Sequence, residues 1–281
     1  MYSVIDPPLA SLRVSLVVPV KDEVENVAAL GAEIVAAMAG SPLTWECLWV
    51  DDGSSDGTAD ALRRLAEQDP RHRVLTLERN YGQSAAMAAG FSAARGDLLV
   101  TLDGDGQSDP ADVPRLLDLL LAENVDVVNG RRARRQDGLV RKLSSRIANG
   151  FRNWLTDEHV QDVGCSLRVM RRGAVRNLFV FRGMHRFLPT LARLNGFDRI
   201  LEVPVNHRPR LRGHTKYGIQ NRLWVGLADA FAVRWLQRRL VRPHVLPEAL
   251  VRPAGREVRS GGGAPPPRPS ASAGTGAGLG A

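Results

Sequence analysis

The sequence predicts an α/β protein with a mostly parallel, twisted sheet and helices on both faces. Short aliphatic runs alternate with helical patterns through the first half of the 281 residues, which is typical of such sheets. Hydrophobic residues make up 44% and charged residues 24%, as in water-soluble globular proteins. Polar clusters follow three of the aliphatic runs, at the edge where open α/β sheets bind ligands.

The predicted elements follow in order along the chain. Aliphatic runs predict strands at residues 13–20, 44–50, 74–77, 97–102, 125–128, 166–170 and 200–205. Helical patterns predict helices at 25–39, 57–67, 82–94, 111–122 and 223–240. The last is a C-terminal amphipathic helix, with Trp224, Leu227, Phe231, Trp235 and Leu236 as its apolar residues.

We expect four parts: an N-terminal extension (1–12), a main domain (13–220), the amphipathic helix (221–242) and a disordered Gly/Pro/Ala/Ser-rich tail (243–281). The N-terminus lacks a signal-peptide pattern, and no apolar run reaches the roughly 18 residues of a membrane span. Two cysteines, Cys47 and Cys165, make no disulfide framework, which favours a reducing compartment.

The charge of the chain indicates an anionic partner. The formal net charge is +8 and the pI is near 10.4, which suits nucleic acid, a membrane surface or a phosphorylated substrate. Residues 131–147 are rich in arginine and predict a mobile basic loop that could bind phosphates. A nucleic-acid-binding module is a weaker alternative, because aromatic residues make up only 5% and no binding motif is recognised.

Asp103-Gly104-Asp105 is the sharpest local motif. Two carboxylates on either side of a glycine, directly after a buried strand, can face one point. Hard oxygen ligands suit Mg²⁺ or Mn²⁺, which also bind substrate phosphates. Gln107 offers a further oxygen. The alternative is an ordinary surface Asp-x-Asp pair, which is common.

A second cluster, residues 51–58, follows another strand. A carboxylate there can accept hydrogen bonds from ribose hydroxyls or a base N–H. We assign this role to Asp52 and leave the role of Asp51 open. A helix-capping turn is the alternative, with Ser55 or Asp56 as the cap. The chain has no phosphate-binding GxxxxGK[ST] and no GxGxxG after its first strand, which disfavours nucleotide triphosphatases and dinucleotide-binding enzymes.

Seven motifs occur in a specific order: VVPVKDEVENV (17–27), VDDGSSDGT (50–58), RNYGQSAAMAAG (79–90), TLDGDGQSDP (101–110), NGRRARR (129–135), DVGCSLRVMRR (162–172) and HRPRLRGHTKYG (207–218). Together they resemble family 2 glycosyltransferases of the GT-A fold, in the polyprenyl-phosphate branch that includes dolichol-phosphate mannosyltransferase. The resemblance covers roughly residues 15–239.

This resemblance implies an inverting, metal-assisted transfer from a nucleotide-diphosphate sugar to a polyprenyl phosphate. The implied nucleotide pocket contains Pro19, Val20, Lys21, Glu23, Val50 and Asp52. The implied Mg²⁺ or Mn²⁺ and diphosphate site contains Asp103, Gly104, Asp105 and Gln107. Arg131 or Arg134 would meet a phosphate, Asp162 is the implied acceptor-side acid, and Arg168 follows it in the same motif. The implied segment closing over the phosphates holds Arg208, Arg210, Lys216 and Tyr217.

The chain departs from the family pattern at two points. Lys21 and Asp22 stand where the family has an aromatic residue and Asn, which removes the usual stacking contact on the base. Many relatives carry membrane helices after the catalytic domain, whereas this chain offers only the amphipathic helix. That helix predicts either peripheral binding at the cytoplasmic face of a membrane or packing on the core. The sequence carries no signal for an oligomeric state.

Two classes of acceptor are compatible with the sequence. A phosphate monoester, with a second pKa near 6, is already nucleophilic at neutral pH and needs no strong base. The alternative acceptor is a hydroxyl of a glycan or protein, for which Asp162 would act as the base.

Overall fold

A computed structural model describes residues 12–132, 150–209 and 222–241. Arg134, Arg210, Lys216 and Tyr217 lie outside the described residues, as do most of the predicted basic loop and the C-terminal tail. The described residues up to Leu240 belong to one compact unit.

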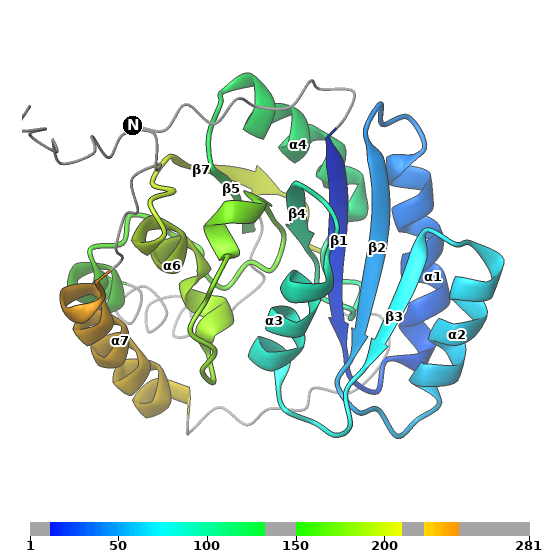
Figure 1. Ribbon diagram of the computed structural model, residues 1–281, viewed down its shortest axis with the longest axis horizontal. Helices are drawn as coiled ribbons and strands as arrows, with labels where there is room; N and C mark the ends of the chain where they lie inside the picture. The colour runs from blue at the N-terminus through cyan, green and yellow to red at the C-terminus, as the bar shows by residue number, and fades with distance from the viewer. Residues whose placement is uncertain (1–11, 133–149, 210–221, 242–281) are drawn as a thin grey trace, which may run out of the picture. The chain divides into compact units, whose positions relative to one another are not determined.

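In the described part of the chain, seven strands form one sheet in the order β3-β2-β1-β4-β6-β5-β7 (Figure 1). Their bounds are β1 Arg13–Val20, β2 Thr44–Asp51, β3 His72–Thr76, β4 Leu98–Thr101, β5 Val127–Arg132, β6 Arg168–Arg171 and β7 Ile200–Val205. Neighbouring strands are parallel, except that β6 runs antiparallel to β4 and β5. The prediction of a mostly parallel sheet is therefore confirmed.

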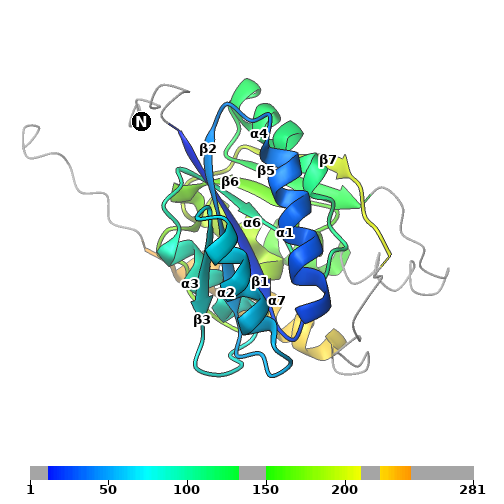
Figure 2. The same ribbon diagram turned by 90° about the vertical axis from the view of Figure 1, so that its right-hand side faces the viewer.

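Helices cover both faces of the sheet, as predicted. One face carries α1 Val24–Met38, α2 Thr58–Gln68 and α4 Val113–Ala122, and the other carries α3 Gln83–Ala93, α6 Leu188–Leu194 and α7 Arg222–Arg239. Short 3₁₀ turns are η2 Pro110–Asp112, η3 Arg172–Val175 and η4 Met184–Phe187, and residues 150–156 are helical. Figure 2 shows α1 and α3 on opposite sides of β1.

β1 explains why its sequence is almost continuously apolar. Leu16 and Val18 face the core under α1, whereas Val17 faces the core under α3. Since both faces of the strand are buried, both sets of alternating side chains must be hydrophobic. This strand therefore lies between the two core clusters, and its carboxyl end is held in a fixed position.

β5 is longer than the sequence predicts. It pairs with β7 in parallel register through Arg131 opposite Pro204 and Arg132 opposite Val205. Both arginines therefore belong to a strand, and the prediction that they begin a mobile loop is wrong. Pairing with β7, which lies about 70 residues later in the sequence, keeps these polar residues extended.

α7 has apolar side chains on two sides. Ala230 and Val233 are buried in the core, with Leu236 packed against it, whereas Phe231 and Trp235 remain 54% and 64% exposed. The aliphatic residues Ala230, Val233 and Leu236 thus face the domain, and the aromatic residues Phe231 and Trp235 face outward. Within the described residues, no helix combines the length and the hydrophobicity needed to cross a membrane.

Candidate active site

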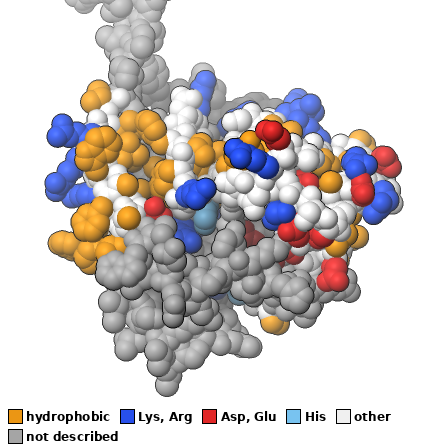
Figure 3. Space-filling view, turned by 90° about the horizontal axis from the view of Figure 1, so that it is seen from below, with side chains coloured by type: hydrophobic (Ala, Val, Ile, Leu, Met, Phe, Trp, Pro, Cys, Tyr) orange, Lys and Arg blue, Asp and Glu red, His pale blue; other side chains and the backbone are white. Residues whose placement is uncertain are grey.

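The parallel strands β1, β2, β3 and β4 end at one edge of the sheet, the lower edge in Figure 1. Polar loops follow each of these ends, and Figure 3 looks onto this side, where acidic side chains gather at the right. The predicted clustering of polar residues at one edge is therefore seen in the structure.

Asp52 fastens the loop after β2 to the loop after β3. Its Oδ1 accepts a hydrogen bond from the Tyr81 N–H at 2.7 Å, and its Oδ2 accepts one from the Gly82 N–H at 2.8 Å. Gly53, at φ 68°, allows this close approach, because a Cβ there would lie 2.6 Å from the backbone carbon of Arg79. A carboxylate has about four acceptor positions, so Asp52 retains capacity for a ligand.

The loop after β1 lies against the same region. Lys21 Nζ donates to the Gly53 carbonyl at 2.8 Å and pairs with Asp22 at 3.0 Å. Glu23 is buried, and its Oε2 accepts a hydrogen bond from Asn26 Nδ2 at 2.6 Å. Lys21 thus supports loop geometry where the family pattern has an aromatic residue.

The remaining predicted nucleotide-pocket residues, Pro19, Val20 and Val50, lie at the ends of β1 and β2, where Pro19 stands opposite Val50. The structure therefore brings these strand-end residues close to the loops that carry Lys21, Glu23 and Asp52.

The charge of Asp105 acts on Asp103. Burial and the charge of Asp105 raise the pKa of Asp103 to about 6. Gln83 Nε2, at the start of α3, donates to Asp103 Oδ1 at 2.7 Å. A cation bound beside Asp103 would stabilise its charged form, which burial and the charge of Asp105 disfavour.

Gly104 holds the loop of these two carboxylates against β1. A Cβ at this position would overlap Val20 Cγ1 and lie 3.1 Å from the Pro19 carbonyl oxygen. Asp105 Oδ1 also accepts the Gln107 N–H at 3.1 Å. The carboxylate pair is therefore packed directly onto the strand end of the predicted nucleotide pocket.

The oxygen donors of this loop fit a hard divalent cation whose remaining coordination positions are filled by substrate and water. Among the described residues, no group of three or more His, Cys, Asp or Glu side chains converges as a metal site. Two carboxylates and the nearby Gln107 leave positions for water and phosphate oxygens, which is how Mg²⁺ commonly binds in phosphoryl sites. The residues suit Mg²⁺ or Mn²⁺ in this arrangement.

Arg168 is a buried cation whose charge acts on Asp103. Its Nε donates to Asn129 Oδ1 at 2.6 Å, its Nη1 donates to the His185 carbonyl at 3.3 Å, and its Nη2 donates to the Val163 carbonyl. Its charge also lowers the pKa of Asp103, although burial outweighs this effect. Arg168 therefore holds Asn129 and the segments of Val163 and His185 together, and it does not project into the site.

Asp162 is held by Arg132, a residue that the sequence does not indicate as part of the site. Arg132 Nε and Nη2 donate to the two carboxylate oxygens of Asp162 at 2.8 and 2.7 Å, and the Arg132 N–H donates at 3.1 Å. A carboxylate gripped by a bidentate arginine is a poor proton acceptor. This contact favours an orienting role for Asp162 over a role as base.

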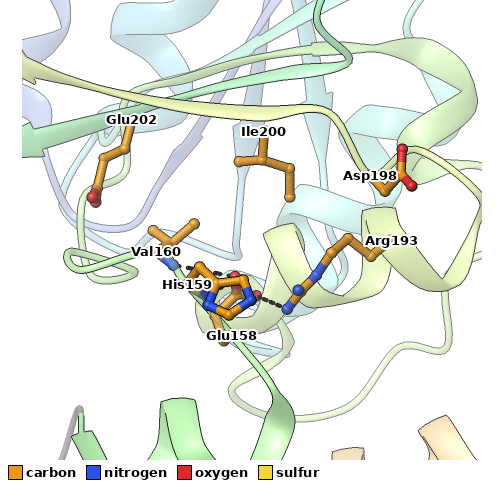
Figure 4. A pocket seen from close by; sticks show the side chains of 7 residues that line it. All are labelled: Glu158, His159, Val160, Arg193, Asp198, Ile200 and Glu202. Carbon is orange, nitrogen blue, oxygen red and sulfur yellow. Dashed lines mark hydrogen bonds and ion pairs between the residues drawn. The ribbon is translucent and has the colours of Figure 1, made fainter.

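Glu202 on β7 fixes the loop that carries Asp162. Its two oxygens accept the N–H groups of Asp162 at 2.8 Å and Gln161 at 3.1 Å. Glu202 also lines a small cavity with Glu158, His159, Val160, Arg193, Asp198 and Ile200 (Figure 4). There Glu158 pairs with Arg193 at 3.1 Å and accepts hydrogen bonds from the N–H groups of His159 and Val160.

Two further predicted residues lie at the margin of the site. Arg131 is exposed at the end of β5. Arg208 pairs with Glu33 at 2.8 Å and Asp109 at 2.6 Å, and its N–H donates to the Gln107 carbonyl at 2.8 Å. Arg208 therefore lies directly beside the loop of Asp103 and Asp105.

The sequence placed Gln83 in the polar cluster after the third predicted strand without a specific role, and it did not indicate Arg132 and Glu202 as site residues. The signal for Arg132 was present, because it adjoins Arg131 in the NGRR motif, but its partner lies 30 residues away. A single glutamate in a predicted strand, such as Glu202, carries no sequence signal for such a contact.

The fold and this edge define a glycosyltransferase of the GT-A type. Residues 15–179 match the model of glycosyl transferase family 2, and the chain belongs to this family.

Two relatives of the chain are also sugar transferases or synthases named for a polyprenyl phosphate. The chain is 38% identical to dodecaprenyl-phosphate galacturonate synthase of Rhizobium johnstonii over 84% of this chain and 70% of that protein. It is 41% identical to undecaprenyl-phosphate 4-deoxy-4-formamido-L-arabinose transferase of Sodalis glossinidius over 75% of this chain. It spans 65% of that transferase, slightly less than two thirds.

Two solved structures share the fold. Mannosyl-3-phosphoglycerate synthase from Rubrobacter xylanophilus superimposes with a TM-score of 0.59 at 21% identity, covering 86% of this chain and 80% of that one. Glucosyl-3-phosphoglycerate synthase from Mycobacterium tuberculosis, in complex with Mn²⁺ and uridine-diphosphate-glucose, gives 0.60 at 19% identity, covering 82% and 79%. These likenesses establish the fold.

Proposed function

We propose that this glycosyltransferase moves a sugar from a nucleotide-diphosphate sugar to a polyprenyl phosphate, with inversion. The observation that carries the proposal is the position of the Asp103–Asp105 loop, which packs through Gly104 against Val20 of β1 and lies beside Arg208. An acidic pair suited to a cation, next to an arginine, can gather two phosphate-bearing substrates. The relatives named for dodecaprenyl and undecaprenyl phosphate support this acceptor.

Asp103, Asp105 and Gln107 would hold the divalent cation, Mg²⁺ or Mn²⁺. When bound there, the cation would neutralise charge on the departing diphosphate. A solved structure of the same fold contains Mn²⁺, which supports this assignment. Gly104 would keep the carboxylates against the nucleotide pocket of Pro19, Val20, Lys21, Glu23, Val50 and Asp52.

In the proposed reaction, a phosphate oxygen of the acceptor forms a bond to the anomeric carbon. The bond from that carbon to the nucleoside diphosphate breaks, and the nucleoside diphosphate leaves with its electron pair. The acceptor phosphate is largely dianionic at pH 7, since its second pKa is near 6. Asp162 is therefore needed to orient Arg132 and the acceptor, not to remove a proton.

Four further cations were predicted to act on the phosphates. Arg131 and Arg208, with Arg134 and Lys216 outside the described residues, would supply positive charge to the phosphates. Arg208 lies beside the loop of Asp103 and Asp105, because its N–H donates to the Gln107 carbonyl, which supports a role near the diphosphate.

We further propose that the protein works peripherally at the cytoplasmic face of a membrane. α7 exposes Phe231 and Trp235, and Arg238 and Arg239 of its last turn suit anionic headgroups. Both cysteines are buried and free, as suits a reducing compartment.

A thermal-shift screen of nucleotide sugars, with and without Mn²⁺, tests the donor site, because binding to the folded state raises the unfolding temperature. We expect a hit that requires Mn²⁺ and disappears in Asp105→Ala. Asp118→Asn, at an exposed position of α4, is the matched control. The identified donor is then incubated with undecaprenyl phosphate, and labelled sugar should pass into organic solvent. Absence of any metal-dependent donor, or transfer only to soluble hydroxyl acceptors, would contradict the proposal.

A further inference from the structure

The first turn of α3 lies at the carboxyl edge of the sheet (Figure 1). Its N-cap residue, Gly82, donates its N–H to Asp52 Oδ2 at 2.8 Å, and the next residue, Gln83, donates through Nε2 to Asp103 Oδ1 at 2.7 Å. Gly82 has a φ of 94°, a conformation that favours glycine, so the chain turns sharply into the helix. Two neighbouring residues therefore contact the carboxylates proposed for the nucleotide and for the cation.

Ser84, the following residue of this turn, contacts the other side of the site. Its side chain is buried, and its Oγ shares a hydrogen bond of 2.9 Å with Nδ1 of His185 in η4. η4 packs against α3, and the His185 carbonyl accepts a hydrogen bond from the buried Arg168 at 3.3 Å. The first turn of α3 therefore joins the carboxylates that follow β2 and β4 to the buried arginine of β6.

The start of α3 lacks the usual helix caps. Its N-cap residue is a glycine, which has no side chain to accept a hydrogen bond from the N–H groups of the first turn, and the first turn contains no acidic residue. The rest of the helix is mostly Ala, Ser and Gly, and a Cβ at Gly90 would overlap Val17 Cγ1 of β1. Small side chains form shallow ridges, which hold a helix less firmly against rotation than large ones do. We therefore expect the contacts of Gln83 and Ser84 to set the position of the first turn.

Gln83 in turn orients the Asp103 carboxylate. Its amide occupies one acceptor position of Oδ1, and the hydroxyl of Ser166 also forms a hydrogen bond with this carboxylate. A carboxylate has about four acceptor positions, so the two donors fix its rotation and leave positions for a cation. Removal of a hydrogen bond that orients a metal ligand in this way typically changes metal affinity by about 10- to 100-fold.

We propose that the hydrogen bond between Ser84 and His185 is a positioning contact for the cation site. It fixes the first turn of α3, so that the Gln83 amide holds the Asp103 carboxylate in the orientation that binds the cation. The inference rests on the proposed function, since Asp103 is a ligand only if the divalent cation binds there.

Binding of Mn²⁺ alone to the full chain tests the positioning contact without catalysis. Electron paramagnetic resonance of free Mn²⁺ gives the Kd of each variant with no nucleotide sugar present. Ser84→Ala, His185→Phe and Gln83→Leu should each weaken Mn²⁺ binding about tenfold. Ser92→Ala, at an exposed position in the last turn of the same helix, should leave it unchanged. Thermal unfolding establishes that each variant is folded.

Two further variants separate positioning from a general structural role. His185→Asn places an amide near the position of Nδ1 and should recover part of the Mn²⁺ affinity that His185→Phe loses. Because Ser84 acts through Gln83, the double variant Ser84→Ala/Gln83→Leu should bind Mn²⁺ about as weakly as Gln83→Leu alone.

Folded Ser84→Ala and His185→Phe variants with wild-type Mn²⁺ affinity would overturn the positioning contact. A double variant that shows the product of the two single losses would overturn it as well. In both cases the proposed function stands, provided that the wild-type protein transfers sugar to undecaprenyl phosphate. A wild-type protein that binds no Mn²⁺ would overturn the positioning contact and the proposed metal-assisted transfer together.

Discussion

The two sides of the site are built in different ways. On the side of β1 to β4, carboxylates at strand ends are held by backbone N–H groups, as Asp52 is by Tyr81 and Gly82. On the side of β5 to β7, buried arginines bind side chains and carbonyls from distant segments, as Arg168 does. The first side therefore tolerates change in most neighbouring side chains, whereas the second depends on individual long side chains.

The largest expected effect that separates the two sides is on stability. Arg168→Met leaves the Asn129 and Val163 acceptors buried without their donor, so the free energy of unfolding should fall by about 3 kcal/mol. Urea denaturation measures this. Arg63→Met, exposed on α2, should change stability by less than about 0.5 kcal/mol. An equal loss of stability in the two variants would show that the β5 to β7 side does not depend on this individual buried arginine.

Gly104→Ala tests whether activity needs the close packing of the Asp103–Asp105 loop against β1. The added methyl group would overlap Val20, so the Asp103–Asp105 loop must shift, and kcat/KM should fall about 10²-fold. Steady-state kinetics with the donor found by the screen measure this. Gly40→Ala, where a Cβ meets nothing within 4 Å, is the control. Unchanged kinetics in Gly104→Ala would show that the close packing is not needed.

Asp162→Asn tests whether the arginine-held side supplies a base. Because Arg132 engages both carboxylate oxygens, we expect a loss of about tenfold in kcat/KM and no change in the shape of the pH–rate profile. A drop of about 10³-fold, together with loss of the acidic limb of that profile, would assign Asp162 as the base.

The smallest effect concerns the pH dependence of stability. The pKa of Asp103 near 6 in the folded protein lies above its ordinary value of 3.8, so the native state binds this proton more tightly than the unfolded chain. Stability should therefore decrease as pH rises from about 4 to about 6 and remain lower above that range. Metal-free Asp103→Asn, which has no proton to lose, should unfold at a higher temperature than wild type at pH 7 and at a similar temperature at pH 4.

Melting curves across this pH range measure the difference, and Mn²⁺ should raise the unfolding temperature of the wild type only. A wild-type protein that is as stable as the variant at pH 7 without metal would contradict the prediction.

The same contrast explains what could be predicted from sequence. β1 and β7 agree with their predicted bounds, and Asp52, Asp103 and Asp105 lie at the predicted edge, because strand ends and turn motifs are local signals. Helix 150–156 and η4 were not predicted, since short helical segments have too few residues to show a period. For α7, the apolar pattern could not show that Val233 would face the core and Trp235 the outside.

Asp52 has a consequence for the thermodynamics of donor binding. Because Asp52 already joins two loops through the backbone N–H groups of Tyr81 and Gly82, the proposed nucleotide pocket would exist before a nucleotide binds. Preorganisation of this kind spares the ordering entropy that a flexible pocket would lose on association. Calorimetry should accordingly show a modest heat-capacity change for the nucleotide, of the size expected from the surface it covers and without a contribution from loop folding.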